Sequence, residues 1–582
     1  MKYPATLLAL WIASTLPAAD FDVRTFGATG DGKTIDTAAI NQAIDAASAA
    51  GGGTVRFPAG TYLSFSIHLK SRITLLLDAG CTIVAATPAT GGGTYDPAEP
   101  NEWGDKQYQD FGHSHWHDSL IWGENLEDVS ITGGGRIFGK GLVRGGGGGG
   151  GRGGRGPQGP NGTIAPGEAV ATAPATATPT PARGPQTPPP AGRGGGGGFG
   201  GGPGSGTKSI ALKNCRNVTL RDFSILQGGW FGILATGVDN FTIDNLKVDT
   251  NRDGFDLDNC RNLRISNCSV NAPNDDAIVL KSSYALGELR SCENITIDGC
   301  QVSGWDVGSF LDGTYKTTQD RAPDRDGPTG RIKCGTESNG GFKNIAISNC
   351  VFIRSRGLAL ESVDGALIED IAISNITMRD LSSSAIFLRL GNRARGPEGT
   401  PIGALRRVSI SHLVASGVDA RYPIIIAGLP GHPIEDVALS DIRVVSRGGL
   451  SLDDAAKQPA DLVNTFFLRG PGLAGPRDPF APPEQEKGYP EPSMFGLLPA
   501  SGMFVRHAKN LTVDQLDVSY AKEDMRPAIV LIDVEGIQFT NGKAQRSAGT
   551  PFFALRGVKA FSAQNCTGLA NTQRANTENE SL

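Results

Sequence analysis

The sequence predicts an all-β protein, a single-domain right-handed parallel β-helix, and three observations lead to this fold class. A short phrase recurs, as NVTLRDFSIL from Asn217, NFTIDNLKVD from Asn240 and NLRISNCSV from Asn262. These starts lie 23 and 22 residues apart, and a unit of this length that repeats many times is typical of a solenoid. Within each copy, apolar and polar residues alternate with the period of a β-strand. A unit this short cannot bury its apolar face alone, so the copies must stack.

Further copies extend the stack toward the C-terminus. They begin at Asn294, Asn344, Asp370, Val408, Asp436 and Asn510. We expect the recurring Asn to occupy a position where its amide hydrogen-bonds to the next coil.

The first residues, 1–19, are typical of a secretory signal peptide. A basic start at Lys2 precedes an apolar stretch that ends near Leu16, and the small residues Ala18 and Ala19 precede Asp20. The alternative is an N-terminal membrane anchor. The signal peptide predicts a secreted or periplasmic protein.

Residues 20–143 are expected to form an N-terminal cap and the first coils. The run DTAAINQAIDAASAAGGG has Asp36 or Thr37 as a helix cap, apolar residues at helical spacing, and then glycines that end the helix. A short amphipathic helix here would cover the open end of the stack.

Residues 144–207 are expected to form a disordered insertion. Glycine runs broken by Arg flank an Ala/Thr/Pro segment, and such a stretch has almost no side chains to bury. The main β-helix then occupies residues 208–568, with a long Pro-rich loop near 453–503 that we expect to form a wall of a cleft. Residues 569–582 are expected to be a flexible tail.

Charge and cysteine content exclude several classes of protein. The 54 basic and 59 acidic residues give a net charge of −5, so nothing favours nucleic acid as a partner. No apolar run of 18 residues follows the first 20, so no membrane contact is expected after processing.

Nine scattered cysteines favour buried thiols over a disulfide framework, although one or two bridges stay open. We expect a monomer without cofactor or metal.

Two adjacent copies of the repeat carry a group of carboxylates. NRDGFDLDN contains Asp253, and NDDAIVLKS contains Asp275 and Asp276. Asp253 and Asp275 are 22 residues apart, which predicts that they lie one above the other, about 4.8 Å per coil. Like charges this close raise the proton affinity of at least one carboxyl, so one can act as an acid and another as a base. Glycoside hydrolysis needs this division, although a solvated acidic turn or a calcium site would also fit.

At these residues the sequence resembles glycoside hydrolase family 28, the polygalacturonase-like enzymes that cut pectin in plant cell walls. The resemblance runs from FDVRTFGATGDGKTIDTAAINQAIDAA through SLIWGENLEDVSITGGGRIFGKG to the repeats that end near residue 420. NRD resembles the family's N-T-D motif and NDD resembles its D-D motif. The resemblance implies that Asp275 is the general acid and that Asp253 and Asp276 position and deprotonate water. It also implies inversion at the anomeric carbon, with acid and base about 6.5 to 9.5 Å apart.

Two motifs of the family are missing. Thr329 lies near the place of the histidine in G-H-G, and Ala359 and Glu361 stand where Arg and Lys of R-I-K are expected. Arg331 and Lys333 spell R-I-K with Ile332, but one coil too early. Either these two cations bind the carboxylate of a galacturonate, or the subsite accepts a neutral sugar such as rhamnose, which we favour. The expected substrate-binding residues are Asn251, Lys281, Arg331, Lys333 and Glu361.

A histidine ladder is a weaker candidate site. His113, His115 and His117 alternate in HSHWH, which on a strand would turn three imidazoles to one side. Such a set could bind zinc or copper. We favour a hydrogen-bonded ladder or a sugar-contacting wall beside Trp116.

These observations predict an exported, inverting glycoside hydrolase that acts on pectic polysaccharide, either exo-acting on a galacturonosyl or rhamnosyl linkage or cutting near rhamnose. One alternative is a pectate-lyase-like enzyme that eliminates with calcium. Another is a non-catalytic carbohydrate-binding β-helix, which the missing motifs would explain.

Overall fold

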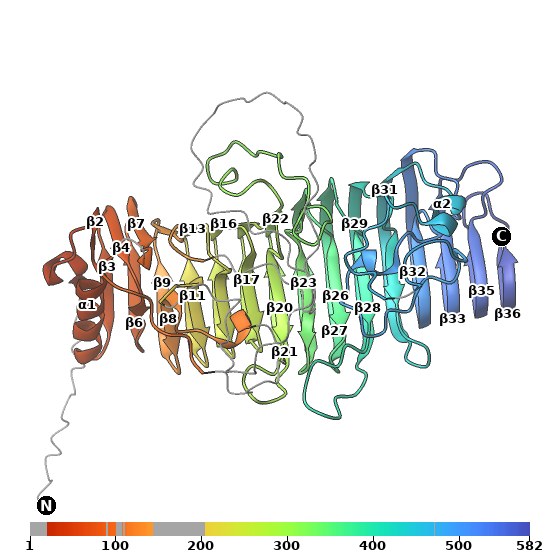
Figure 1. Ribbon diagram of the computed structural model, residues 1–582. Helices are drawn as coiled ribbons and strands as arrows, with labels where there is room; N and C mark the ends of the chain where they lie inside the picture. The colour runs from red at the N-terminus through yellow and green to blue at the C-terminus, as the bar shows by residue number, and fades with distance from the viewer. Residues whose placement is uncertain (1–19, 89–90, 101–107, 109–110, 144–203, 471) are drawn as a thin grey trace, which may run out of the picture.

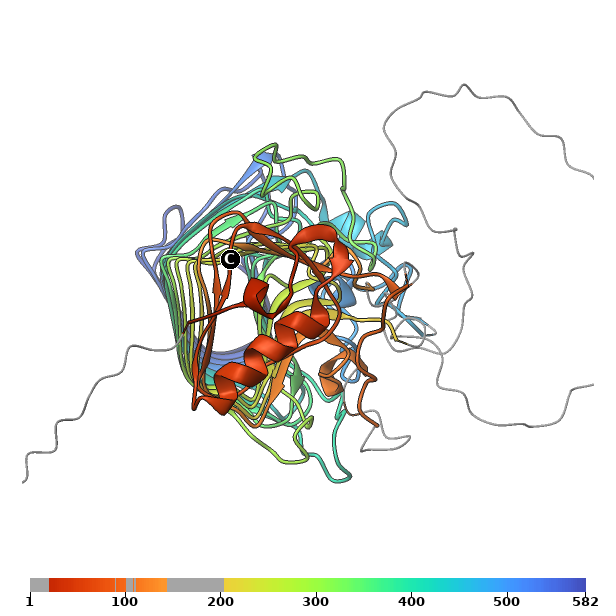
Figure 2. The same ribbon diagram turned by 90° about the vertical axis from the view of Figure 1, so that its left-hand side faces the viewer.

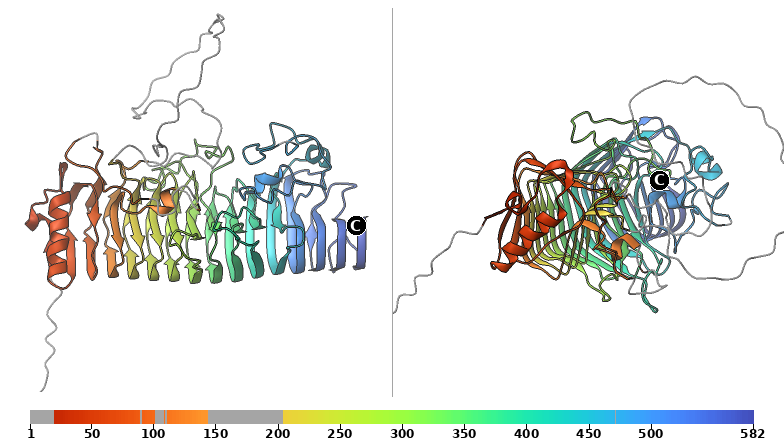
Figure 3. Two further views of the ribbon diagram at one scale, coloured as in Figure 1. Left: turned by 60° about the horizontal axis from the view of Figure 1, so that its bottom comes forward. Right: turned by 60° about the vertical axis from the view of Figure 1, so that its left-hand side comes forward.

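The computed structural model describes residues 20–88, 91–100, 108, 111–143, 204–470 and 472–582. The predicted signal peptide 1–19 and nearly all of the predicted insertion 144–207 lie outside these residues. The described chain is a right-handed parallel β-helix, in which coil after coil stacks along one axis from α1 to β36 (Figures 1 and 3).

Three parallel sheets, which we call sheets A, B and C, form the sides of the β-helix. The strands of sheet A are β5 (Ile67–His68), β8 (Ser119–Glu124), β11 (Lys208–Lys213), β14 (Phe231–Thr236), β17 (Asp253–Asp258), β20 (Ile278–Ser282), β23 (Ile332–Ser338), β26 (Leu358–Ser362), β28 (Ile386–Leu390) and β30 (Ile424–Ala427). The strands of sheet B are β1 (Asp20–Asp22), β3 (Gly53–Phe57), β6 (Ile73–Leu77), β9 (Glu127–Thr132), β12 (Arg216–Arg221), β15 (Asp239–Asp244), β18 (Arg261–Ser266), β21 (Cys292–Asp298) and β24 (Phe342–Ser348). The strands of sheet C are β2 (Asp31–Ile35), β4 (Gly60–Ser64), β7 (Cys81–Ala85), β10 (Arg136–Phe138), β13 (Ser224–Leu226), β16 (Lys247–Asp249), β19 (Ser269–Asn271), β22 (Gln301–Ser303) and β25 (Val351–Ile353).

Longer strands continue the stack toward the C-terminus. They are β27 (Leu367–Arg379), β29 (Ala404–Val418), β31 (Ile434–Gly448), β32 (Met503–Lys522), β33 (Ile529–Thr540) and β35 (Phe553–Gln564), with the short β34 (Lys543–Ala544). β27 pairs with both β24 and β25, so a single long strand there replaces two strands of the earlier coils.

The core lies inside the coils, because the apolar positions of successive repeats are in register. In sheet B one continuous column of buried side chains consists of Val218, Phe241, Leu263, Ile295, Ile345 and Ile371. The alternation seen in the sequence therefore marks the inward face of each strand.

The recurring asparagine forms a ladder between coils, as the sequence predicts. The amide of Asn240 donates to Asn217 at 3.0 Å, and that of Asn344 donates to Asn294 at 2.8 Å. These residues have φ between 52° and 58°, a left-handed conformation that Asn tolerates better than most side chains. All nine cysteines lie in the described part of the chain, and all are buried free thiols, as expected.

The N-terminal helix closes one end of the stack. α1 (Thr37–Ala49) follows η1 (Val23–Phe26) and lies across the end of the coils (Figure 2). Its buried side chains are Ile40, Ala43, Ile44 and Ala47, the spacing of one helical face. Asp36 occupies the N-cap position, but its carboxylate accepts hydrogen bonds from the backbone of Thr29 and Gly30 instead of capping the helix.

The predicted flexible tail is wrong for residues 572–581. They form β36 (Thr572–Ser581), which pairs antiparallel with β35 and so covers the last strand edge of the stack. The remaining helices are η3 (Phe111–Ser114), α2 (Leu452–Lys457) and η4 (Pro492–Phe495). Among the described residues, no helix is long and apolar enough to cross a membrane.

Candidate active site

Three carboxylates from two adjacent coils of sheet A converge. One oxygen each of Asp253, Asp275 and Asp276 lies within 4.8 Å of the other two. The strand register pairs Phe255 with Ile278, so Asp253 aligns with Asp276 and not, as the spacing predicted, with Asp275. The true offset is 23 residues (255 to 278), one more than the count between motifs suggested. The three carboxylates therefore lie close together, but the residue that stacks on Asp253 in the next coil is Asp276 and not Asp275.

A glycine allows the two coils to close beside this cluster. A Cβ at Gly254 would lie 2.4 Å from the carbonyl oxygen of Ala277. Instead, the amide of Gly254 donates to the carbonyl oxygen of Asp276 at 3.0 Å. This backbone bond fixes the height of Asp253 relative to Asp276.

The pKa values of Asp253 and Asp276 are shifted in opposite directions. Both side chains are buried, with 3% of each residue exposed. Burial, and next the charge of Asp275, raise the pKa of Asp253 well above its usual range. Burial also opposes ionisation of Asp276, but Arg331 and Lys333 outweigh it and hold the pKa of Asp276 below its usual range. The surroundings therefore favour the protonated form of Asp253 and the ionised form of Asp276.

Two buried cations of the next coil, Arg331 and Lys333, bind the carboxylate of Asp276. Nε of Arg331 donates to one oxygen at 2.7 Å, and Nζ of Lys333 lies 3.2 Å from the other. Arg331 and Lys333 are each 2% exposed. Because both side chains are buried against Asp276, Arg331 and Lys333 are not ordinary solvated surface residues.

Asp275 is the accessible member of the cluster. Its side chain is 27% exposed, and Nη2 of Arg252 lies 2.5 Å from its Oδ2. The guanidinium of Arg252 in turn lies over Trp230, 5.5 Å from the ring centroid. Arg252 occupies the middle position of the NRD motif, and that departure from N-T-D was the signal that could have identified it.

Two other predicted substrate-binding residues, Lys281 and Asn251, are buried. Lys281 is 6% exposed and forms ion pairs with Asp256 at 3.0 Å and Glu337 at 3.1 Å. Asn251 is 3% exposed, and its Oδ1 has no hydrogen-bond partner in the described structure. Substrate contact by Lys281 or Asn251 stays a prediction.

The prediction that Glu361 faces the substrate is wrong. Glu361 is fully buried, and its Oε2 lies 3.5 Å from Nζ of Lys333. Burial, despite Lys333, raises the pKa of Glu361 to about 7. The side chain therefore supports Lys333 from behind, because β26 is the strand of sheet A that follows β23, which carries Lys333.

The long loop near 453–503 contacts the cations beside the cluster, and its role as a wall of a cleft stays a prediction. Oε1 of Glu491 lies 2.5 Å from Nη2 of Arg331 and 3.0 Å from Nη1 of Arg356. Nearby, Nζ of Lys333 lies 5.6 Å from the ring centroid of Tyr489. Tyr489 is 40% exposed and stacks on Phe467, with centroids 5.4 Å apart. The repeat was not traced into this loop, so no register was available from which to find Tyr489 or Glu491.

The predicted histidine ladder does not form. Residues 111–114 are the 3-10 helix η3 and not a strand, so the alternation does not turn the rings to one side. Nε2 of His113 instead lies 2.9 Å from Asp256 and 2.6 Å from Nζ of Lys281. His117 lies elsewhere, between Glu99 and Glu124.

Two family models match parts of the chain. Residues 21–112 match the model "Rhamnogalacturonase A/epimerase, pectate lyase-like", and residues 202–319 match "Right handed beta helix region". The fold and the second match together define a right-handed parallel β-helix protein.

Within that class, the structural similarities include polygalacturonases of glycoside hydrolase family 28. A family 28 exopolygalacturonase of Yersinia enterocolitica aligns with a TM-score of 0.56 at 16% identity, over 90% of this chain and 78% of that one. The exopolygalacturonase of Thermotoga maritima aligns with a TM-score of 0.51 at 19% identity, over 74% and 88% of the two chains. At these identities the comparison shows the shared fold.

Sequence relatives divide into one long match and several short ones. A probable polygalacturonase of Vitis vinifera is 22% identical over 439 residues, 72% of this chain and 73% of that protein. Mannuronan C5-epimerase AlgE3 of Azotobacter vinelandii is 70% identical over 43 residues. That stretch is 7% of this chain and only 2% of AlgE3, so the short matches cover a small piece of those relatives.

Proposed function

We propose that this chain is an exported glycoside hydrolase that cleaves pectic polysaccharide, acting from a chain end on a galacturonosyl or rhamnosyl linkage. The observation that carries the proposal is the cluster of Asp253, Asp275 and Asp276, whose oxygens lie within 4.8 Å and in which the pKa of Asp253 is raised and that of Asp276 lowered. A secreted or periplasmic location follows from the N-terminal sequence. The similarity to polygalacturonases supports the substrate class.

The proposed reaction uses Asp275 as the acid, with Asp253 beside it. Burial, and next the charge of Asp275, raise the pKa of Asp253. Asp275, the more exposed of the two, delivers the proton to the glycosidic oxygen as the bond to the anomeric carbon breaks. Asp276 accepts a proton from the water whose oxygen attacks that carbon.

We propose inversion at the anomeric carbon, although one distance does not fit the expectation. The nearest carboxyl oxygens lie within 4.8 Å, whereas acid and base in inverting enzymes are about 6.5 to 9.5 Å apart. Inversion is supported by the contacts of Asp276, since cations occupy both of its oxygens. A carboxylate held in this way is a poor nucleophile toward the sugar and is better suited to orient water.

The subsite beside the cluster suits a neutral sugar. Arg331, Lys333 and Lys281 are each bound to buried carboxylates of the protein, so their charges are already balanced. A galacturonate carboxylate would have to displace one of these partners in a site of low dielectric constant. This supports rhamnose over galacturonate at that position.

The test is product analysis of the purified protein on homogalacturonan, rhamnogalacturonan and short synthetic glycosides. We expect released saturated sugars, and proton NMR of the first product should show the inverted anomer. Retention would refute the role of Asp276 as base while leaving hydrolysis standing. Binding of polymer without sugar release would refute the enzyme and favour a carbohydrate-binding β-helix.

Calcium-dependent elimination is the second candidate, since Asp253, Asp275 and Asp276 could together hold a cation. It predicts an unsaturated product that absorbs in the ultraviolet and activity that a chelator abolishes. Saturated products in the presence of chelator would exclude it.

A further inference from the structure

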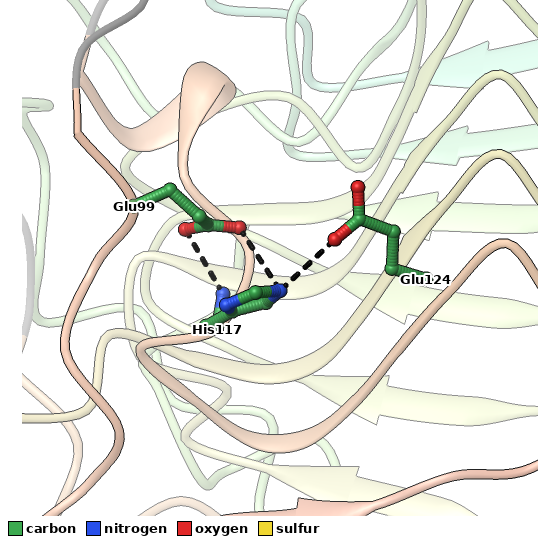
Figure 4. A group of neighbouring side chains, drawn as sticks. All are labelled: Glu99, His117 and Glu124. Carbon is green, nitrogen blue, oxygen red and sulfur yellow. Dashed lines mark hydrogen bonds and ion pairs between the residues drawn. The ribbon is translucent and has the colours of Figure 1, made fainter.

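A second cluster of potential ligands lies on sheet A, away from the proposed catalytic carboxylates. Glu99, His117 and Glu124 come from three different segments, and Figure 4 shows their side chains meeting at the imidazole of His117. Glu124 is the last residue of β8. In the register of sheet A it aligns with Lys213 of β11, which aligns with Thr236 of β14 and then with Asp258 of β17. Three coils at about 4.8 Å each separate the cluster from β17 by about 14 Å.

Two carboxylates approach the same ring nitrogen. Nε2 of His117 lies 3.1 Å from Oε2 of Glu124 and 3.5 Å from Oε1 of Glu99. A single N–H cannot point at both oxygens, so a proton on Nε2 serves one of them well and the other poorly. A cation between the three atoms would serve all of them.

The spacing suits zinc. With bonds of about 2.0 to 2.1 Å, two ligand atoms at corners of a zinc tetrahedron are about 3.3 Å apart. The two observed distances, 3.1 and 3.5 Å, lie on either side of this value. An imidazole with two carboxylates is also a donor set that zinc accepts and that calcium and magnesium, which prefer oxygen alone, do not.

Neighbouring groups hold each ligand in this orientation. The backbone amide of Trp116 donates to Oε2 of Glu99 at 3.0 Å and to Oε1 at 3.2 Å, and the amide of His117 donates to Oε2 at 3.2 Å, which holds the carboxylate beside the imidazole. Nζ of Lys213 binds the other oxygen of Glu124, Oε1, at 3.1 Å. The ring of His117 stacks on Trp122, with centroids 3.9 Å apart.

The three side chains are neither sealed nor fully open. They are 27%, 16% and 25% exposed for His117, Glu99 and Glu124, so an ion can enter while part of its coordination shell is protein. Two carboxylates against one lysine leave a net negative charge that attracts a divalent cation.

We propose that Glu99, His117 and Glu124 form a zinc site with a fourth position open to water. The site ties Glu99 and His117 to β8, and so stabilises this part of sheet A ahead of the carboxylate cluster. This inference does not depend on the proposed hydrolase activity.

The test is zinc binding by the full chain after treatment with chelator and dialysis. Equilibrium dialysis with elemental analysis should show one zinc per chain and a rise in melting temperature on zinc addition. Loss of a partner that merely supports a ligand costs about 10- to 100-fold in metal affinity, so His117→Gln should cost at least about 100-fold. Glu124→Gln, which keeps the shape of the side chain, should also weaken binding.

Two control variants make the result specific. Glu435→Gln alters a partly exposed glutamate of β31 and should bind zinc as the wild type does. Asp275→Asn alters the other acidic cluster and should also retain zinc. The proposal is overturned if the wild type binds no zinc, if His117→Gln binds it equally well, or if Asp275→Asn is the variant that loses it. Melting curves without zinc establish that each variant is folded.

Discussion

Sheets A and B differ on their outer faces, although the same repeats build both. In β15 of sheet B, only the inward residues Phe241 and Ile243 are buried, and the positions between them are partly or fully exposed. In β17 of sheet A, all six residues are buried, including Asp256 and Asp258 on polar positions. The outer face of sheet A is covered by loops such as 453–503, whereas that of sheet B faces solvent. Burial of the polar positions, more than the apolar alternation, therefore marks where the chain has built a site.

The ion pairs of the two sheets differ in the same way. In sheet A, Lys281 pairs with Asp256 and Glu337, and all three are nearly inaccessible. In the long strands that continue sheet B, Arg407 pairs with Glu369 while its side chain is 44% exposed. An exposed pair contributes little to stability, but removal of one partner from a buried pair leaves a charge without compensation. The comparison predicts large effects of substitution in sheet A and small ones in sheet B.

The largest expected effect is loss of catalysis in Asp275→Asn. Removal of a positioned acid should reduce turnover by about 100- to 10,000-fold while leaving the fold intact. The matched control is Asp244→Asn in β15 of sheet B, which should leave turnover within about twofold. Initial rates on the best substrate of the panel measure both. Turnover of Asp275→Asn near that of the wild type would refute its role as acid.

The second effect concerns the anchor of the long loop. Glu491→Ala leaves the buried cations Arg331 and Arg356 without their shared partner. We expect the free energy of unfolding to fall by about 3 to 5 kcal/mol, measured by urea denaturation. Glu369→Ala, whose partners Arg406 and Arg407 are 40% and 44% exposed, is the control and should unfold almost as the wild type does. Equal losses in both variants would contradict the contrast between the sheets.

The fold could be predicted because its determinants repeat. The apolar column through Phe241, Leu263 and Ile295 and the ladder of asparagines recur in nearly every coil, so many copies of one short pattern agree. The carboxylate cluster could be found for the same reason, since two adjacent copies depart from the pattern together. The register of Asp253 was wrong by one residue because a count between motifs does not include the extra residue in the turn before β20.

The contacts around the cluster could not be predicted because they come from outside the repeat. Glu491 reaches Arg331 across 160 positions of the chain, and nothing in a local pattern specifies such a pairing. Glu361 was placed on the correct strand, but the sequence did not show that a lysine of the preceding coil would cover it. His117 was selected for its neighbouring histidines, whereas its actual partners are glutamates from other segments.

The third prediction is a pH dependence that has opposite sign in the two sheets. The pKa of Glu361 is raised from 4.5 to about 7, so its contribution to stability is complete below about pH 4.5 and is lost as the pH rises to about 7. In sheet B, hydrogen bonding from Ser266 lowers the pKa of Asp244, so its contribution is present at neutral pH and is lost on acidification below about pH 4.

Glu361→Gln should remove the first of these effects. Between pH 5 and pH 7 we expect the wild type to lose about 2 kcal/mol more stability than the variant, since each unit of pKa corresponds to about 1.4 kcal/mol. Urea denaturation at the two pH values measures the difference. Asp258, whose pKa burial raises to about 6, titrates in both proteins and does not affect the comparison. If the wild type and Glu361→Gln lost the same stability between pH 5 and pH 7, this would show that Lys333 keeps Glu361 ionised at both pH values.

The smallest effect compares Tyr489, in the long loop, with a tyrosine of another exposed loop. Tyr489 lies beside Lys333 and is 40% exposed, so its ring is available to a sugar bound over the carboxylates. Loss of an aromatic contact worth about 1 kcal/mol corresponds to an increase in KM of about fivefold in Tyr489→Ala, with kcat nearly unchanged. Tyr489→Phe keeps the ring and should keep most of the affinity. Tyr315→Ala, at a tyrosine that is 51% exposed, should leave KM as it is. If Tyr489→Ala lowered kcat and left KM unchanged, the ring would act on the carboxylates and not on the sugar. Tyr489 would then contribute to the chemical step instead of to substrate binding.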